Sequence, residues 1–224
     1  MQPIEVDTVV LDVDGTLVDS VYTHVQAWLD AFLTIGTVVP AWHIHRAIGM
    51  GGDRLVAEVA GQRVEDAMGD RIRELHDKGY ESQFGSVRAF DRADDLLRLL
   101  HGRGFTVALA SSGTAEQTDR ALELLAADEV ARSRVSSASV SSSKPAPDLI
   151  EAAMRDAGAS RAVVVGDSVW DVAAAQHAGV PAVGLRSGGF CDTDLIEAGC
   201  VSVFESVADL VERFDESGLT YVSG

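Results

Sequence analysis

Asp12-Val13-Asp14-Gly15-Thr16, which closes the apolar run Val6–Val13, is the most informative stretch of this sequence. The run is typical of a buried β-strand. Residues two apart on a strand point to the same side, so Asp12 and Asp14 are expected to converge. Two close carboxylates need a compensating cation or proton, and oxygen ligands suit a hard divalent ion such as Mg²⁺. The alternative is an ordinary acidic turn after a strand, since Asp and Gly are common in turns.

The composition is that of an ordinary soluble globular protein. Of the 224 residues, 46% are apolar and 24% are charged, and the formal net charge is -17. This charge argues against a nucleic-acid partner, because phosphate backbones are bound by basic surfaces, and it disfavours anionic membrane surfaces. It does not exclude a small phosphorylated metabolite, because a bound metal and one lysine can reverse the local sign.

The amino terminus and the cysteines bear on the cellular compartment. Residues 1–7 carry neither a basic segment nor a long apolar run, so we expect no signal peptide, and no stretch approaches the length of a membrane span. Only Cys191 and Cys200 are present, which does not make a disulfide-rich secreted scaffold. We therefore expect a cytoplasmic protein, either a monomer or a small homo-oligomer.

Short apolar runs alternate with longer amphipathic segments along most of the chain. This alternation predicts right-handed crossovers and a parallel sheet covered on both faces, so the expected core is α/β and doubly wound, or Rossmann-like. The predicted strands are Thr8–Val13, Phe105–Ala110, Ala162–Val165, Val180–Leu185 and Val201–Phe204. The predicted helices are Asp91–His101, Ala115–Ala126, Pro147–Ala157, Val169–Ala178 and Val207–Phe214.

The segment from Ser20 to Phe84 interrupts this alternation. It shows helical periodicity with no convincing strand, and it is too long for an ordinary crossover between two strands. We interpret it as an inserted all-helical cap domain over residues 19–87, with residues 1–18 and 88–224 forming the catalytic core. The serine-rich stretch Ser136–Ser143 is expected to be a loop.

A second polar motif, Ser111-Ser112-Gly113-Thr114, closes the strand predicted to end at Ala110. Thr114 and Gln117 form a capping-box pattern, which places Ser111 and Ser112 just ahead of a helix. Hydroxyls and free backbone N–H groups at a helix start suit a phosphate group. The alternative is a capped strand-helix junction without a ligand.

Lys144 begins a third motif, Lys144-Pro145-Ala146-Pro147-Asp148. Two prolines before an amphipathic run mark a helix start, and they restrict the backbone around the lysine. We expect Lys144 to reach inward from this loop. The alternative is a lysine that is simply solvated.

The fourth motif, residues 166–171, follows the strand Ala162–Val165 and contains Asp167 and Asp171. These carboxylates are four residues apart and share one helix face near the first turn. Helix capping accounts for one of them, but not for both together with the pair at Asp12 and Asp14. Since ligands bind at the carboxyl ends of strands in a doubly wound sheet, we expect all four motifs to form one site.

The four motifs, in this order and at this spacing, resemble the signature of the haloacid dehalogenase-like superfamily. That signature is D-x-D-G-T, a strand-terminal Ser or Thr, a Lys and a late G-D-x-x-x-D. The resemblance extends through Ala173–Gly184 and covers nearly the whole core.

The resemblance implies a reaction mechanism. Asp12 would attack phosphorus and become an aspartyl phosphate, and Asp14 would protonate the leaving oxygen and then deprotonate water. Mg²⁺ would be held by oxygens of four acidic residues: the carboxylates of Asp12 and Asp167, the main-chain carbonyl of Asp14, and Asp171 in support. The groups expected to bind the phosphoryl oxygens are Lys144, Ser111 and Ser112.

Substrate choice is expected to belong to the cap. The stretch from Asp19 to Trp28 resembles the corresponding part of β-phosphoglucomutase and of phosphoglycolate and sugar-phosphate phosphatases. His24 is expected near the leaving group, and Gly51, Gly52 and Arg54 in a substrate loop, with Arg54 contacting a distal anionic group. The alternatives are a cleft-facing histidine without a chemical role and a solvated arginine.

The favoured function is a magnesium-dependent phosphatase of a small phosphorylated metabolite, either a sugar phosphate or a phosphoglycolate-like compound. Asp14 disfavours carbon–halogen and phosphonate chemistry, because relatives with those activities are expected to lack this aspartate. The second hypothesis is a phosphomutase of the β-phosphoglucomutase type. Lys78 lies near the cap position where that enzyme carries its lysine, but the flanking sequence does not support the match.

Overall fold

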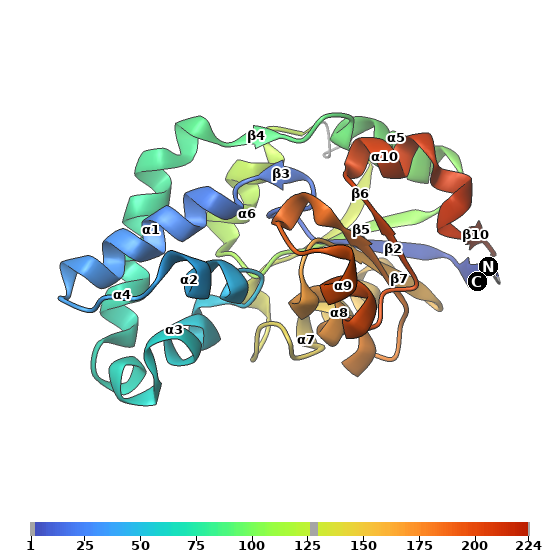
Figure 1. The fold of residues 1–224 in the computed structure, drawn as a ribbon. Coiled ribbons are helices and arrows are strands. Elements are labelled where there is room, and N and C mark those ends of the chain that lie inside the picture. Colours follow the sequence, from blue (N-terminus) through green and yellow to red (C-terminus); the bar gives the residue numbers. More distant parts are fainter. Residues whose placement is uncertain (1–2, 126–129, 224) are drawn as a thin grey trace.

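The structure, a computed structural model, describes residues 3–125 and 130–223, and a six-stranded parallel sheet forms its centre (Figure 1). The strand order is β6-β5-β2-β7-β8-β9, and every neighbouring pair is parallel. These strands are β2 (Thr8–Leu11), β5 (Thr106–Ala110), β6 (Ala131–Val135), β7 (Ala162–Gly166), β8 (Ala182–Leu185) and β9 (Ser202–Phe204). The α/β doubly wound fold predicted from the sequence is confirmed.

Helices cover both faces of the sheet because side chains on a strand point alternately to opposite sides. Val9 and Leu11 pack into one apolar cluster, while Val10 packs into the other. The helices that contribute to the first cluster are α5 (Ala93–Gly102), α6 (Ala115–Leu122) and α10 (Val207–Glu212). Those that contribute to the second are α7 (Asp148–Ala157), α8 (Val169–His177) and α9 (Asp192–Ala198).

Strand β2 is buried along its whole length and is therefore a rigid support for the residues that follow it. Burial of each Val or Leu side chain contributes roughly 1.5–3 kcal/mol. Its neighbours β5 and β7 run parallel to it in matched register, with Leu11 paired to Leu109 and to Val165. The carboxyl ends of these three strands consequently lie side by side.

A helical insert leaves the sheet between β2 and β5 and packs around its own apolar cluster (Figure 1). Its helices are α1 (Val21–Thr34), α2 (Ala41–Ala47), α3 (Gly52–Ala60), α4 (Gln62–Gln83) and the 3₁₀ helix η1 (Phe84–Ser86). Two short antiparallel strands, β3 (Val18–Asp19) and β4 (Arg88–Ala89), connect the insert to the core. The helical character predicted for residues 20–84 is found; the domain bounds 19–87 stay a prediction.

Several helices and strands are shorter in the structure than the sequence analysis predicted, and strand β6 was not predicted at all. The first predicted strand ends at Leu11 rather than Val13, so Asp12 lies just beyond it. The helix predicted over Ala115–Ala126 ends at Leu122, and Ala126 is outside the described residues. Strand β6 was not predicted, because only Ser133 and Val135 of its residues are buried and the apolar pattern is weak. The stretch Ser136–Ser143 is a loop with one 3₁₀ turn at Ser137–Ser139, η3.

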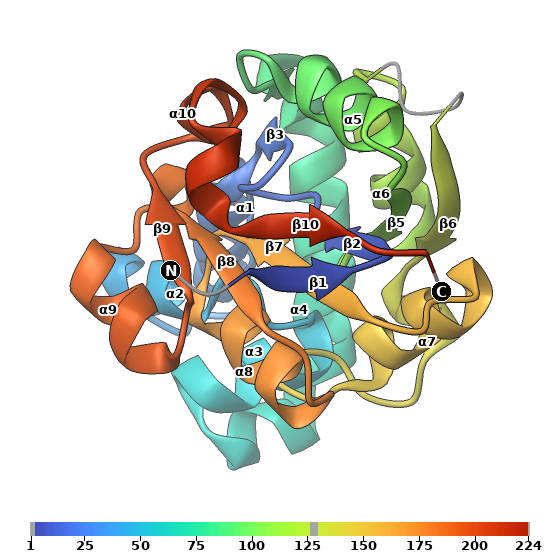
Figure 2. The ribbon, with the colours of Figure 1, turned by 90° about the vertical axis from the view of Figure 1, so that its right-hand side faces the viewer.

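A second small sheet ties the two ends of the described chain together. Strand β1 (Ile4–Val6) pairs in parallel with β10 (Leu219–Tyr221), as Figure 2 shows. Within residues 3–125 and 130–223, no helix is long and apolar enough to cross a membrane.

Candidate active site

Four buried charged groups lie together where β2 and β7 end. Asp12 follows β2, Asp167 follows β7, Asp171 lies in the first turn of α8, and Lys144 precedes α7. One ligand oxygen from each of the three carboxylates lies within 4.8 Å of the others, and all three residues are buried. The structure therefore brings together the four residues that the sequence analysis took from three separate motifs.

Lys144 is the cation of this group. Its side chain is fully buried, and Nζ donates to Asp12 Oδ1 and lies 2.6 Å from Asp171 Oδ1. Burial alone would lower the pKa of Lys144, but the two carboxylates outweigh that cost and raise it. The expectation that Lys144 reaches inward from its loop agrees with this placement, and the solvated alternative does not.

The acidic cluster has more negative charge than Lys144 balances. When all three carboxylates are ionised they face one ammonium group, and two negative charges are left uncompensated. Burial raises the pKa of Asp12 and Asp167, the neighbouring carboxylates add to this, and Lys144 opposes it. An all-oxygen, doubly negative cluster fits a divalent hard cation such as Mg²⁺. The side chain of Asp14 is not part of this cluster.

The backbone around Asp167 leaves no room for larger residues. Thr16 Oγ1 donates to Asp167 Oδ1 at 2.9 Å, which accounts for the last residue of the D-x-D-G-T motif. A Cβ atom on Gly15 or on Gly188 would overlap the carboxyl group of Asp167. Gly15 also has φ of 80°, a conformation that favours glycine. Gly188 was not identified from the sequence.

A capping box fixes Asp171. Ser168 caps helix α8, and its Oγ and backbone N–H both donate to Asp171 Oδ2, at 2.6 and 3.1 Å. The other carboxyl oxygen of Asp171 is left to face Lys144. Capping and ligand binding are thus compatible roles for one carboxylate.

Asp14 is surrounded by hydrogen-bond donors. Oδ1 receives Ser20 Oγ at 2.6 Å and lies 3.3 Å from His24 Nε2, and Oδ2 receives Ser111 Oγ at 3.3 Å. Burial would raise the pKa of Asp14, but the contacts with His24, Ser20 and Ser111 outweigh it and lower the pKa below its usual range. The helical insert therefore supplies two of the three groups that hold this carboxylate, His24 and Ser20.

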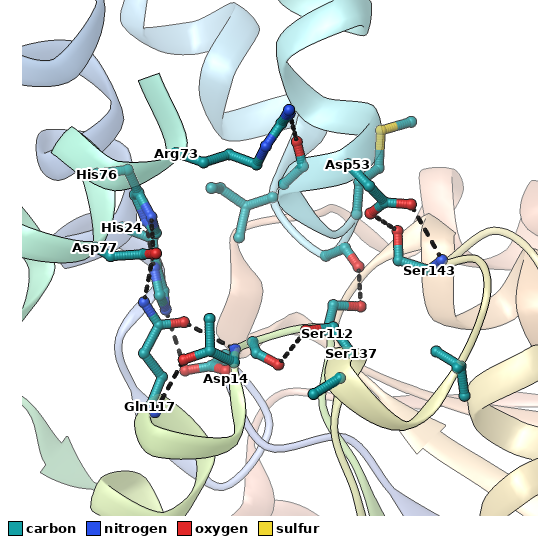
Figure 3. A pocket seen from close by; sticks show the side chains of 18 of the residues that line it. Asp14, His24, Asp53, Arg73, His76, Asp77, Ser112, Gln117, Ser137 and Ser143 are labelled. Atoms are coloured by element: carbon teal, nitrogen blue, oxygen red, sulfur yellow. Dashed lines mark hydrogen bonds and ion pairs between the residues drawn. The ribbon is translucent and has the colours of Figure 1, made fainter. Parts of the chain in front are cut away.

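His24 continues into a chain of polar contacts that the sequence analysis did not identify (Figure 3). His24 Nδ1 lies 3.1 Å from His76 Nε2, and His76 Nδ1 lies 3.0 Å from Asp77 Oδ1. Gln117 Nε2 of core helix α6 donates to the same Asp77 oxygen at 3.0 Å. The chain links Asp14 to helix α4 and back to the core.

The contacts determine where protons lie in this chain. Burial lowers the pKa of His76 to about 4, so its ring is neutral near pH 7. A neutral His76 that donates from Nδ1 to Asp77 must accept at Nε2, which places a hydrogen on His24 Nδ1. The other ring nitrogen, His24 Nε2, faces Asp14 Oδ1 at 3.3 Å. The chain thus connects Asp14 to His76 and Asp77 through the two ring nitrogens of His24.

The two serines predicted to bind phosphate lie differently. Ser111 is fully buried, donates to Asp14 and accepts the backbone N–H of Gly113 at 3.0 Å. Ser112 lines the cavity, but its Oγ donates to Gly49 O of the helical insert at 3.0 Å. Phosphate binding by Ser111 and Ser112 stays a prediction.

A cavity of about 320 Å³ separates the core from the helical insert, and Figure 3 shows the side chains around it. Asp12, Asp14, His24 and Gly52 are among the residues that line it. Gly51 does not line it but donates its N–H to Ser143 Oγ at 3.0 Å.

Arg54 does not match its predicted placement. It is exposed, and the lining of the cavity does not include it. The arginine that lines the cavity is Arg73 on helix α4. Lys78 is also exposed, and it pairs with Glu74 at 2.5 Å. The periodicity of a polar helix does not reveal which arginine faces a cavity.

The match to a known protein family covers the residues described above. The model of the haloacid dehalogenase-like hydrolase family matches residues 9–185, which include all four motifs. This chain belongs to that family. Comparison with curated proteins gives no significant match.

Solved structures agree with this family membership. A hydrolase from Pseudomonas syringae is 33% identical over 93% of this chain and 98% of its own, with a TM-score of 0.88. A candidate phosphoglycolate phosphatase from Lactobacillus plantarum is 17% identical over 95% of this chain and 99% of its own, with a TM-score of 0.80. A candidate β-phosphoglucomutase from Bacteroides vulgatus is 19% identical over 96% and 90%, with a TM-score of 0.78. At these identities the last two comparisons show the fold alone.

Further contacts hold the helical insert of this haloacid dehalogenase-like hydrolase against its core. His45 Nε2 lies 2.8 Å from Gly188 O, and Trp170 Nε1 donates to the carbonyl of Arg46 at 2.9 Å. Asp53 accepts hydrogen bonds from the hydroxyl and the backbone N–H of Ser143. The insert therefore closes over the acidic cluster at several points.

Proposed function

We propose that the protein is a magnesium-dependent phosphatase that hydrolyses a small phosphorylated metabolite through an aspartyl phosphate. One observation carries the proposal: the buried cluster of Asp12, Asp167 and Asp171, which has two charges more than Lys144 balances, lies beside a separately held carboxylate, Asp14. This arrangement would supply a nucleophile, a site for a divalent ion and an acid-base group, and both Asp12 and Asp14 line the cavity.

Asp12 is the proposed nucleophile because it is fixed at the end of a rigid strand. One oxygen is held by Lys144, which leaves the other free to attack phosphorus. Bound to Asp12, Asp167 and the carbonyl of Asp14, with Asp171 in support, Mg²⁺ would neutralise charge on the phosphoryl oxygens. Lys144 and Ser111 would orient those oxygens.

Asp14 is the proposed general acid and base. Its side chain lines the same cavity as Asp12, so it would protonate the departing oxygen while Asp12 forms the new bond. After the alcohol leaves, the same carboxylate can accept a proton from the water that attacks the aspartyl phosphate. Ser20 holds its orientation through both steps.

The phosphomutase alternative is less well supported. A mutase would need the helical insert to hold a phosphorylated sugar for return of the phosphoryl group. Lys78, which would take the part of the cap lysine, is exposed and paired with Glu74. The expected cytoplasmic location and the oligomeric state stay predictions.

The test is Mg²⁺-dependent release of inorganic phosphate from a panel of phosphorylated metabolites. Asp12→Asn should abolish release while leaving the circular dichroism spectrum and the melting temperature close to those of the unmodified protein. Asp119→Asn removes an exposed carboxylate from helix α6 and serves as the matched control. Retained turnover in Asp12→Asn would refute the covalent mechanism.

A second variant tests the acid role. Asp14→Asn should slow hydrolysis of alkyl phosphates more than that of nitrophenyl phosphate, whose leaving group needs no proton. An equal loss on both substrates would contradict proton donation by Asp14.

A further inference from the structure

Five polar or charged residues that line the cavity, which we call the outer wall, can form hydrogen bonds with a ligand. They are Asp53, Arg73, Asp77, Ser137 and Ser143 (Figure 3). Asp53, Arg73 and Asp77 belong to the helical insert, and the two serines belong to the loop before α7. The part of a substrate that extends beyond the phosphoryl group would face these residues together with Thr114, Gln117, Ser141 and Ser142, which line the same cavity.

Arg73 is the cation of the outer wall, but its charge is already neutralised. Its two terminal nitrogens donate to both carboxyl oxygens of Glu65, at 2.8 and 2.9 Å, to Asp70 at 2.9 Å and to Gly52 O at 3.0 Å. These four contacts use all four hydrogens of the terminal amino groups. The bonds with Glu65 raise the pKa of Arg73, so the pair stays ionised. Of its five N–H donors, Arg73 therefore keeps only the Nε–H for a ligand, and its charge is balanced by Glu65 and Asp70.

The serines of the outer wall are hydrogen-bond acceptors toward the cavity. Ser137 Oγ donates its one hydrogen to Gly113 O at 2.8 Å, and Ser143 Oγ donates to Asp53. A hydroxyl carries a single hydrogen, so only lone pairs remain for a ligand. Asp53 and Asp77 contribute carboxylate oxygens, which also accept.

From this polarity we infer the substrate class, an inference that rests on the proposed phosphatase function. The substrate is a phosphate monoester whose remaining part carries hydroxyl or amino donors and no anionic group, as in sugar and polyol phosphates. A carboxylate or a second phosphate at the outer wall would meet acceptors and two carboxylates, an arrangement that rejects a like charge. Of the two substrate types expected from the sequence, the outer wall favours sugar phosphates over phosphoglycolate-like compounds.

The size of the cavity agrees with this class. About 320 Å³ lies near the lower limit of the roughly 300–1,000 Å³ range of small-molecule sites. A monosaccharide or short polyol phosphate matches such a space. Trp28 of helix α1, which is buried and lines the same cavity, offers an apolar surface for the carbon skeleton.

Two matched pairs of substrates test the inference. Sorbitol 6-phosphate and 6-phosphogluconate differ at the end remote from the phosphate, and so do glycerol 3-phosphate and 3-phosphoglycerate. In each pair one member ends in a hydroxymethyl group and the other in a carboxylate. We expect kcat/KM to be at least about tenfold lower for the carboxylate member of each pair, because its charge meets an unneutralised acidic wall. Nitrophenyl phosphate, which carries no such group, reports phosphatase activity by itself.

A binding measurement separates recognition from turnover. In Asp12→Asn, which should not turn over, calorimetric titration in the presence of Mg²⁺ should give a weaker affinity for 6-phosphogluconate than for sorbitol 6-phosphate. Asp77→Asn should narrow the kcat/KM ratio within each pair by about threefold, since it removes one partly exposed negative charge while keeping an acceptor for His76. Asp119→Asn should leave the ratio unchanged.

The outcomes are distinguishable. Equal or faster hydrolysis of the carboxylate members, with nitrophenyl phosphate also hydrolysed, would overturn the inference and leave the phosphatase proposal intact. An unchanged ratio in Asp77→Asn would overturn the part assigned to that residue. If no ester of the panel, nitrophenyl phosphate included, releases phosphate, the phosphatase proposal and this inference both fail.

Discussion

Replacement of His76 by glutamine should remove part of the acid sensitivity of the fold. His76 is buried against Trp28, with ring centroids 3.9 Å apart, and burial lowers its pKa from 6.5 to about 4. Below pH 6.5 the unfolded chain takes up a proton on this ring that the folded protein refuses, so folding stability falls as the pH falls. The loss begins near pH 6.5 and is complete near pH 4.

The magnitude follows from the difference between the two pKa values. Each pKa unit corresponds to about 1.4 kcal/mol, so the fall from 6.5 to about 4 makes the folded protein about 3 kcal/mol less stable at pH 4 than at pH 7 through His76 alone. Glutamine can still bridge Asp77 and His24 with its amide, but it does not titrate. The His76→Gln variant should therefore lose less stability over this range.

Urea unfolding monitored by circular dichroism, at several pH values between 7.5 and 4.5, measures this difference. His101→Gln, which replaces an exposed histidine on helix α5, is the matched control and should follow the unmodified protein. If His76→Gln and the unmodified protein lose stability in parallel, His76 is not held neutral by burial, and the proton assignment for His24 fails with it.

Three further outcomes are expected around the acidic cluster. Lys144→Met should lower the free energy of unfolding by about 3–5 kcal/mol in urea titrations at neutral pH, because two buried carboxylates lose their cation; an unchanged midpoint would contradict this. Gly188→Ala should lower it by about 1–3 kcal/mol through overlap with Asp167, whereas Gly102→Ala, which has open space, should change it little. Mg²⁺ should raise the melting temperature of the unmodified protein, and an equal rise in Asp167→Asn would refute the proposed ion site.

The positions of Asp12 and Asp167 were predictable because both residues lie at the carboxyl ends of parallel strands. Asp12 and Asp167 each come directly after a buried apolar strand, and parallel strands present their carboxyl ends on one edge. Two prolines marked the loop that delivers Lys144. These signals are local, so one sequence is enough to find them.

The insert side of the cavity was not predictable in the same way. His76 and Arg73 lie on helix α4, whose polar positions look alike in sequence, and only the packing of α4 against α1 selects those that face the cavity. Arg54 seemed suitable because it follows a glycine loop, but the turn of α3 leaves it exposed. Gly188 acts through contact with a residue of another strand end, which no local pattern encodes.

The antiparallel pair β3 and β4 determines how easily the helical insert can change in length and sequence. Val18 and Ala89 are partners in this pair, so the helical insert leaves and rejoins the core at nearly the same point. The entropy of closing such a loop grows only slowly with its length, by about 0.6 kcal/mol for each doubling. Helices between these two residues can thus be lengthened, shortened or exchanged at little cost to the sheet. Under the proposed function, residues of the insert that line the cavity, such as Asp53 and Asp77, can therefore change while the strand ends that bear Asp12 and Asp167 stay as they are.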